Sequence, residues 1–227
     1  MSLFAETTAP IKLSWAKRAA GFAFKSFRKL WHVGSMDPKD KRDDSYEGAG
    51  LSVSVNPEEW QQIARIGGDL WELTKSGNRF VNYHRLTKVQ RKSIREWGVK
   101  NGYATPAELW RHSYFDEEVG EGEWRYSDFD TKEQAEAELG GQGEGVDEKV
   151  EPVEGGLKAT PKLEQKTLRK NISPVEMDDL LVTAYAEDEL DCDGVWWQDT
   201  LDPENLSAPR GVIFPARLPE WSKKKVL

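Results

Sequence analysis

The chain has 227 residues, a formal net charge of −8, a pI near 5.1, one cysteine and ten tryptophans. The acidic balance argues against direct binding to nucleic acid, because the phosphate backbone needs a positive protein face. The lone Cys192 excludes an internal disulfide and favours a reducing, cytoplasmic location. The tryptophans predict a packed core, whereas the 32% of charged residues predicts that part of the chain is not packed.

Residues 1–29 are predicted to carry a basic amphipathic helix. Trp15, Ala19, Phe22 and Phe27 recur near helical spacing, with lysines and arginines between them. Such a helix can lie on a membrane surface, but the acidic total charge favours packing against the rest of the chain. No stretch reaches the roughly 18 apolar residues of a spanning helix, so no membrane-embedded segment is expected.

Two short strands follow. "KLWHVGSM" (29–36) is predicted to be a strand that carries His32 and stops at Gly34. "GLSVSV" (50–55) alternates strictly, so its aliphatic residues face one way and Ser52 and Ser54 face the other. Asn56-Pro57 then predicts the start of a helix.

Further along the chain, the elements predict an α+β core in two parts, 30–139 and 157–227, separated by a flexible acidic linker at 140–156. Between residues 116 and 154 there are fifteen acidic and three basic residues, and the linker has neither periodicity nor much apolar content. The other predicted elements are strands in "DLWELT" (69–74), "EWRYSDF" (123–129), "DGVWW" (193–197) and "GVIFPARL" (211–218), and helices at 87–100, 105–110, 130–139 and after Ser173.

His32 is the most suggestive single residue. Its ring nitrogen can bind a ribose hydroxyl, while Gly34 allows a ligand to approach the backbone. A structural histidine without a ligand is the commoner alternative. Ser52 and Ser54 can line a polar pocket, or they can face solvent on an edge strand. No pair of histidines has the spacing of a metal site, and no hydrolase elbow surrounds either serine.

Trp196 and Trp197 are adjacent on a predicted strand and so face opposite ways. One is expected in the core, while Trp197 can cover a groove. Asp199 follows on the same side as Trp197 if the strand continues, and it can present a carboxylate beside that groove. A surface acid at the start of a loop is the alternative interpretation.

Taken in order, these elements resemble the ADP-ribosyltransferase-like fold, in particular compact members from bacterial toxins and phages. "LWHVGS" (30–35) resembles the family's first-strand motif, with Val33 as an extra residue before Gly34. "GAGLSVSVNPEEW" (48–60) resembles the serine element, and "DCDGVWW" (191–197) resembles a late strand of the family. The resemblance implies that His32 holds the ribose of NAD and that Ser52 or Ser54 lines the nicotinamide pocket. Gly34 and Trp197 are further predicted contacts of NAD, and His32 and Ser52 are also predicted to be catalytic.

The last strand departs from the family pattern. Ser207 and Arg210 stand where the catalytic glutamate would be expected, and an arginine cannot stabilise a developing cation. Asp199 is the best substitute, followed by Glu204. The sequence therefore predicts an NAD-dependent ADP-ribosyltransferase acting on a host protein or other macromolecule. The alternative is a catalytically inactive interaction protein on the same fold, an inhibitor or nucleic-acid mimic whose acidic segment 116–154 binds a basic partner.

Overall fold

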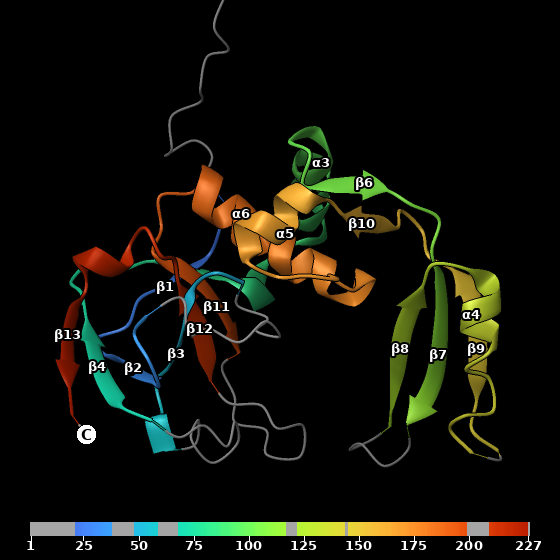
Figure 1. The fold of residues 1–227 in the computed structure, drawn as a ribbon, viewed down its shortest axis with the longest axis horizontal. Helices are drawn as coiled ribbons and strands as arrows, with labels where there is room; N and C mark the ends of the chain where they lie inside the picture. Colours follow the sequence, from blue (N-terminus) through green and yellow to red (C-terminus); the bar gives the residue numbers. More distant parts are fainter. Residues whose placement is uncertain are drawn as a thin grey trace, which may run out of the picture.

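The computed structural model describes residues 21–37, 48–58, 68–116, 122–143, 145–198 and 209–226. These residues form an α+β protein with an eight-stranded sheet, a three-stranded sheet and a two-stranded sheet (Figure 1). The eight-stranded sheet lies on the left of Figure 1, a helical layer lies in the centre, and the three-stranded sheet stands apart on the right.

The eight-stranded sheet brings together strands from both parts of the predicted core. All neighbouring pairs are antiparallel except β5 and β11, which run parallel. In sheet order the strands are β1 (Phe24–Lys25), β5 (Phe80–Asn82), β11 (Gly194–Gln198), β12 (Arg210–Ile213), β3 (Leu51–Ser54), β2 (Leu30–Val33), β4 (Leu70–Thr74) and β13 (Ser222–Lys225).

This sheet curls so that its two ends approach each other. Phe80 lies on the second strand and Trp221 directly before the last, yet their ring centroids are 6.0 Å apart. Trp221 follows a short 3-10 helix, η4 (Leu218–Glu220). The curl encloses a core made by Leu30, Val53, Leu73, Phe80, Trp196, Ile213, Leu218 and Trp221.

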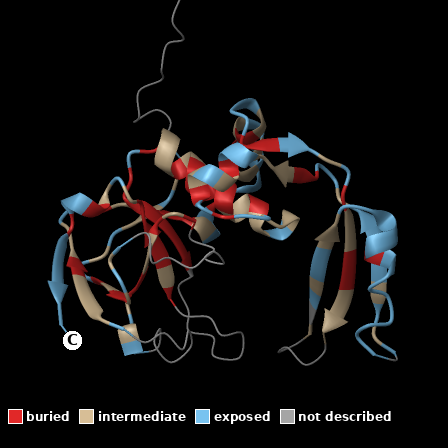
Figure 2. Cartoon of the chain, in the orientation of Figure 1, coloured by how far each residue is buried: buried red, intermediate tan, exposed pale blue. Residues whose placement is uncertain are grey.

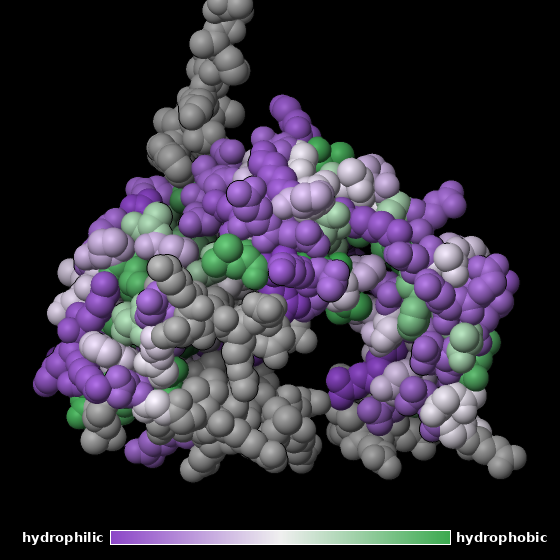
Figure 3. Space-filling view, viewed as in Figure 1, coloured by the Kyte–Doolittle hydropathy of each residue, from purple (hydrophilic) through white to green (hydrophobic). Residues whose placement is uncertain are grey.

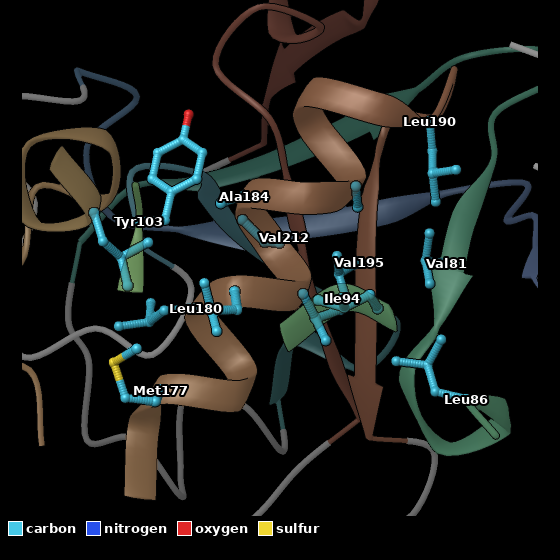
Figure 4. Close-up of a cluster of buried hydrophobic side chains, with 14 of the residues drawn as sticks. Val81, Leu86, Ile94, Tyr103, Met177, Leu180, Ala184, Leu190, Val195 and Val212 are labelled. Carbon is cyan, nitrogen blue, oxygen red and sulfur yellow. The ribbon is translucent and has the colours of Figure 1, made fainter. Parts of the chain in front are cut away.

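The other face of the sheet is covered by the helices α3 (Lys88–Lys100), α5 (Pro161–Thr167) and α6 (Met177–Glu189). Their buried aliphatic side chains meet Val81, Val195 and Val212 of the sheet (Figure 4). Figure 2 shows that buried residues concentrate in α6 and in the strands beneath it. Each fully buried aliphatic side chain contributes about 1.5–3 kcal/mol to stability. This layer contains more buried side chains than the core inside the curl, so it contributes more of the folding free energy.

Helix starts follow local sequence signals. Thr87 accepts a hydrogen bond from the backbone of Gln90, and the Gln90 side chain accepts one from the Thr87 backbone, which forms a capping box for α3. Ser173 and Glu176 form the same arrangement at η3 (Pro174–Glu176), which leads directly into α6. Both starts were predicted from the sequence.

The three-stranded sheet is built from β8 (Glu123–Phe129), β7 (Trp110–Asp116) and β9 (Glu148–Pro152), in that order. The short helix α4 (Lys132–Glu136) packs on one face, where Ala135 is fully buried. On that face His112 Nε2 lies 2.6 Å from Glu148 Oε2, and both side chains are buried. The two-stranded sheet of β6 (Ala104–Pro106) and β10 (Leu157–Ala159) connects this unit to the helical layer.

Three predicted segments differ from the structure within the described residues. Phe24–Lys25 is a strand, so the amphipathic helix of 1–29 does not extend to Lys29; residues 1–20 lie outside the description. The range 140–156, expected to be a flexible linker, contains β9, which pairs with β7 over five residues. The predicted short helix at 105–110 is replaced by β6 and the start of β7.

Other expectations are confirmed. The strands at 29–36, 50–55, 69–74, 123–129 and 193–197 appear as β2, β3, β4, β8 and β11. The predicted helix at 87–100 appears as α3, and the helix after Ser173 appears as α6. Most of the predicted helix after Asn56 lies outside the described residues.

Candidate functional site

The strands that carry the predicted site residues are consecutive in the eight-stranded sheet, in the order β11, β12, β3, β2. Three cross-strand pairs form one row across them: Gln198 with Arg210, Arg210 with Ser54, and Ser54 with Trp31. His32 and Trp197 are the chain neighbours of this row. The fold therefore brings segments that are far apart in the sequence, such as those at Trp31 and Arg210, to the same level of the sheet.

His32 is buried, with 8% of its surface exposed. Its Nδ1 lies 2.8 Å from the backbone oxygen of Ser52, and its Nε2 lies 2.9 Å from the backbone oxygen of Ser35. A neutral imidazole can donate at only one nitrogen, whereas an imidazolium can donate at both. Both ring nitrogens thus face backbone carbonyls of this chain, which fixes the ring between β2 and the turn after it.

Gly34 ends β2 in a conformation that favours glycine, with φ of +118°. Its N–H donates to the Asp69 carbonyl over 2.8 Å, and its own carbonyl accepts from Trp71 Nε1 over 3.1 Å. A Cβ on Gly68 would lie 3.0 Å from the Gly34 Cα. The two glycines therefore allow close approach of two backbone segments beside His32.

The two serines of β3 have different environments. Ser54 is fully buried, and its hydroxyl donates to the Pro209 carbonyl over 2.6 Å and accepts from the Asn56 N–H over 3.1 Å. Ser52 is only half-buried. Ser54 thus links β3 to the residue preceding β12, while Ser52 is the more accessible of the two.

The register also separates His32 from the serine hydroxyls. Ser54 lies opposite Trp31, so these two side chains share one face of the sheet, and His32 points to the other. His32 lies opposite Trp71 and shares its face with Leu30, which belongs to the core inside the curl. The predicted ribose contact and the predicted nicotinamide contacts therefore approach the same strands from opposite faces.

Trp197 lies on the helical face at the end of β11. It is 8% exposed, its ring centroid is 4.7 Å from that of Tyr83, and its Nε1 has no hydrogen-bond partner among the residues that the structure describes. Tyr83 begins the short 3-10 helix η2 (Tyr83–Arg85), directly after β5. The guanidinium of Arg91 lies 4.3 Å from the Tyr83 ring centroid, which adds a cation–π contact.

A partly buried carboxylate completes this cluster. Burial raises the pKa of Asp179, against the opposing effects of a hydrogen bond from Tyr83 and of the positive charges of Arg91 and Arg210. Burial is also the main reason that the pKa of Tyr83 is raised, and the nearby Asp179 adds to it. Tyr83, Arg91, Asp179, Trp197 and Arg210 thus form one aromatic and charged cluster, called here the Tyr83 cluster.

Asp199, Glu204 and Ser207 lie outside the described residues, so the predicted catalytic acid has no described contacts. The chain enters this segment from Gln198, which pairs with Arg210, and leaves it at Pro209, which accepts the Ser54 hydroxyl. Both ends of the segment are therefore attached to the row of β11, β12 and β3.

The sequence did not identify Tyr83, Arg91 or Asp179 as site residues. Tyr83 follows a short strand, and Arg91 and Asp179 lie on helices whose positions relative to the sheet are not encoded locally. An aspartate in the first turn of a helix, such as Asp179 in α6, is also a common feature of helix starts and gives no separate signal.

No family model, curated protein or solved structure matches the chain. Within the described ranges, no cluster of three or more histidine, cysteine or acidic side chains is arranged to hold a metal ion. None of the helices described is both long enough and apolar enough to span a membrane.

Proposed function

We propose that this chain is an ADP-ribosyltransferase-like protein of the bacterial toxin or phage type, which binds NAD where β2, β3, β12 and β11 meet. In this proposal it transfers ADP-ribose to a host protein or another macromolecule in the cytoplasm. The observation that carries the proposal is the strand order: four segments that resemble family elements, or replace one, are adjacent in one sheet.

The surroundings of this row contain groups suited to a dinucleotide. The guanidiniums of Arg91 and Arg210 can bind phosphate oxygens, and Ser52 offers a half-buried hydroxyl. Trp197 and Tyr83 provide aromatic rings beside them. Gly34 is kept as the proposed ribose contact, because both ring nitrogens of His32 already face backbone carbonyls of the chain.

The proposed roles change accordingly. His32 positions the turn at Ser35 and the strand at Ser52, so it acts on the site through the backbone. Ser54 holds the start of β12, while Ser52 contacts the nicotinamide side. Asp199 supplies the carboxylate that stabilises the positive charge developing on the ribose.

The test is incubation of the full chain with NAD labelled in its adenylate part and a host lysate, together with calorimetric titration of NAD. We expect NAD binding by the wild type, weaker binding by Ser52→Ala, and transfer that disappears in Asp199→Asn. Asp130→Asn is the matched control, because Asp130 lies directly after β8, away from the proposed NAD site, and pairs with Lys158 of β10.

Absence of heat on NAD titration of a folded sample would overturn the proposal. NAD binding without transfer in any lysate would retain the site and remove the enzymatic activity. His32→Ala is expected to disturb the fold. A loss of NAD binding in this variant would therefore support a role of His32 in the site only if its thermal unfolding matched that of the wild type.

A second candidate function is favoured by the internal hydrogen bonds of His32 and Ser54. Both ring nitrogens of His32 and the hydroxyl of Ser54 are engaged with backbone groups, as in a purely structural role. In this case the chain is a catalytically inactive acidic interaction protein. Deleting 140–156 is a poor test, since it would remove β9. Neutralising exposed carboxylates in 116–154 without changing partner binding would count against it.

A further inference from the structure

The open face of the three-stranded sheet borders a cavity next to the helical layer. The cavity has a volume of about 370 Å³ and is lined by Arg111, Tyr126 and Asp128 on one side and by η3 and the start of α6 on the other. Figure 3 shows the molecule hollowed at this position. The opposite face of the sheet carries α4, whereas no α-helix of the described residues packs on this face.

β8 forms one side of the opening and is an edge strand. All seven of its residues pair with β7, and no other strand of the described chain lies on its outer side. Every second residue of an edge strand directs its backbone N–H and C=O away from the sheet, where they can pair with another extended segment. β8 contains no proline or lysine, the residues that commonly block such pairing.

Two large aromatic residues on β8 are exposed on the open face. Trp124 is 48% exposed and Tyr126 is 49% exposed, and their spacing places them on the same side. Lys149 Nζ lies 5.0 Å from the Trp124 ring centroid, and the Arg111 guanidinium lies 4.1 Å from that of Tyr126. Both rings therefore already bind cations of this chain, and both retain accessible surface.

The charge around the opening is negative. The cavity is lined by four carboxylates (Asp128, Glu151, Glu154 and Asp178) and two arginines (Arg95 and Arg111). Arg111 is held by Asp128 through two hydrogen bonds of 2.6 and 2.8 Å, and Arg95 pairs with Asp178.

The remaining carboxylates are less well neutralised. Glu151 pairs with the exposed Lys149, and Glu154 has no ion pair within the described part of the chain. Over the whole unit, residues 110–154 contain fifteen acids and only four lysines or arginines. A field of one sign steers oppositely charged partners and selects against like-charged ones.

We propose that β8 and the adjoining cavity form a docking site for an extended, lysine- or arginine-bearing peptide segment of a partner protein, which adds as a strand alongside β8. The peptide backbone pairs with the outer edge of β8. Alternate basic side chains reach Trp124, Tyr126 and the carboxylates of Glu151 and Glu154. This site does not involve NAD and stands independently of the proposed transferase activity.

The experiment uses the full chain and a fluorescent seven-residue peptide of alternating lysine and valine, with binding followed by fluorescence anisotropy. We expect saturable binding that weakens with salt. The doubly substituted Trp124→Ser/Tyr126→Ser and Glu151→Gln/Glu154→Gln chains should each bind at least tenfold more weakly. Glu133→Gln is the matched control, since Glu133 lies on α4 at the opposite face, and it should change affinity less than twofold.

Two further peptides separate strand addition from charge alone. The same sequence with its backbone nitrogens methylated keeps its charges but cannot donate to β8, so its binding should be lost. A peptide of alternating glutamate and valine should not bind. Equal binding by the methylated peptide, binding of the glutamate peptide, or wild-type affinity of both doubly substituted chains would each overturn the proposal.

Sedimentation of the chain alone tests a different occupant. A dimer that is lost in Trp124→Ser/Tyr126→Ser would show that a second copy occupies β8, and would overturn assignment of the site to a basic partner. A monomer at the concentrations used for anisotropy supports the proposal.

Discussion

The Nδ1 of His32 lies 2.8 Å from the backbone oxygen of Ser52, so the histidine of β2 contacts the backbone of β3 and not its serine hydroxyls. The second ring nitrogen lies 2.9 Å from the Ser35 oxygen. The conspicuous histidine of "LWHVGS" therefore connects three backbone segments at the row where the predicted site residues gather.

His32→Ala should lower the free energy of unfolding by about 1–3 kcal/mol, because a buried hydrogen bond from the ring to a backbone carbonyl is lost and the space of the ring is left empty. The measurement is urea unfolding followed by tryptophan fluorescence. His84→Ala is the matched control, since His84 is exposed, and should shift stability by less than about 0.5 kcal/mol. An unchanged urea midpoint of unfolding for His32→Ala would contradict the structural role. The imidazole would then again be a candidate ligand contact.

Local features of the fold were readable from the sequence because they depend on near neighbours. The alternation of β3 predicted which side chains share a face: Val53 is fully buried inside the curl, and Ser54 lies opposite. The helix predicted over 87–100 begins as expected, and the structure shows a capping box between Thr87 and Gln90 at its start.

Pairing between distant strands was not readable. Nothing near His32 specifies that Trp31 lies opposite Ser54, yet this register decides that His32 and the hydroxyls face opposite ways. β9 was not predicted because its sequence, "EKVEP", is charged. It is an edge strand that pairs with β7 on one side only, and edge strands tolerate charged residues. β1 was missed because it has two residues and Phe24 lies within a helical periodicity.

Gly98 lies where α3 packs on α6, and this packing decides the effect of replacing it. Alanine in a helix interior is favoured over glycine by about 1 kcal/mol. A Cβ at Gly98, however, would lie 2.7 Å from Leu181 Cδ2, and Leu181 is fully buried. Overpacking of this kind costs about 1–3 kcal/mol, so Gly98→Ala should destabilise the protein.

Thermal and urea unfolding of Gly98→Ala measure this balance. Ser93→Ala, at an exposed position of the same helix, should be neutral or slightly stabilising. Adding Leu181→Ala to Gly98→Ala should cost less than Leu181→Ala costs in the wild type, since the new methyl group occupies part of the space. Stabilisation by Gly98→Ala alone would show that α3 and α6 separate easily.

Cys192 is predicted to be unreactive in the folded protein. It is 4% exposed, and burial raises the pKa of its thiol to about 12, from an ordinary value near 9. The nucleophile is the thiolate, whose fraction at pH 8 falls on the order of a thousandfold for such a shift. Reaction with a disulfide reagent at pH 8 should therefore be at least a hundredfold slower in buffer than in urea. Comparable rates would show that the end of α6 opens readily.

Lys75 and Asp193 join the end of β4 to the start of β11. Lys75 Nζ lies 2.5 Å from Asp193 Oδ1 and 2.6 Å from Glu220 Oε2, and the Arg79 N–H donates to Asp193 over 2.8 Å. Asp193 is 4% exposed, so its charge needs these donors. Lys75→Met should lower the free energy of unfolding by about 2 kcal/mol at pH 7, as expected for a hydrogen bond to a buried charge.

The pH dependence of this difference identifies the ion pair as its cause. Burial lowers the pKa of Lys75, but the hydrogen bonds to Asp193 and Glu220 outweigh it, so the net pKa is raised. A raised pKa means that the stabilisation is complete below the pKa of the unfolded lysine, about 10.4. It is lost as the pH rises through the folded value. The gap between wild type and Lys75→Met should thus be constant from about pH 6 to 9 and shrink above about 10.4.

Lys29→Met is the matched control for this measurement. Lys29 pairs with Glu72 over 2.7 Å, but its side chain is 44% exposed, so the substitution should cost less than about 1 kcal/mol at any pH. A Lys75→Met gap that persists unchanged up to pH 11 would assign the effect to packing of the lysine's methylene chain. If the difference in unfolding free energy between wild type and Lys75→Met instead disappears by pH 11, the effect is due to the charge of Lys75. Only its ammonium form supplies a positive charge to the buried carboxylate of Asp193.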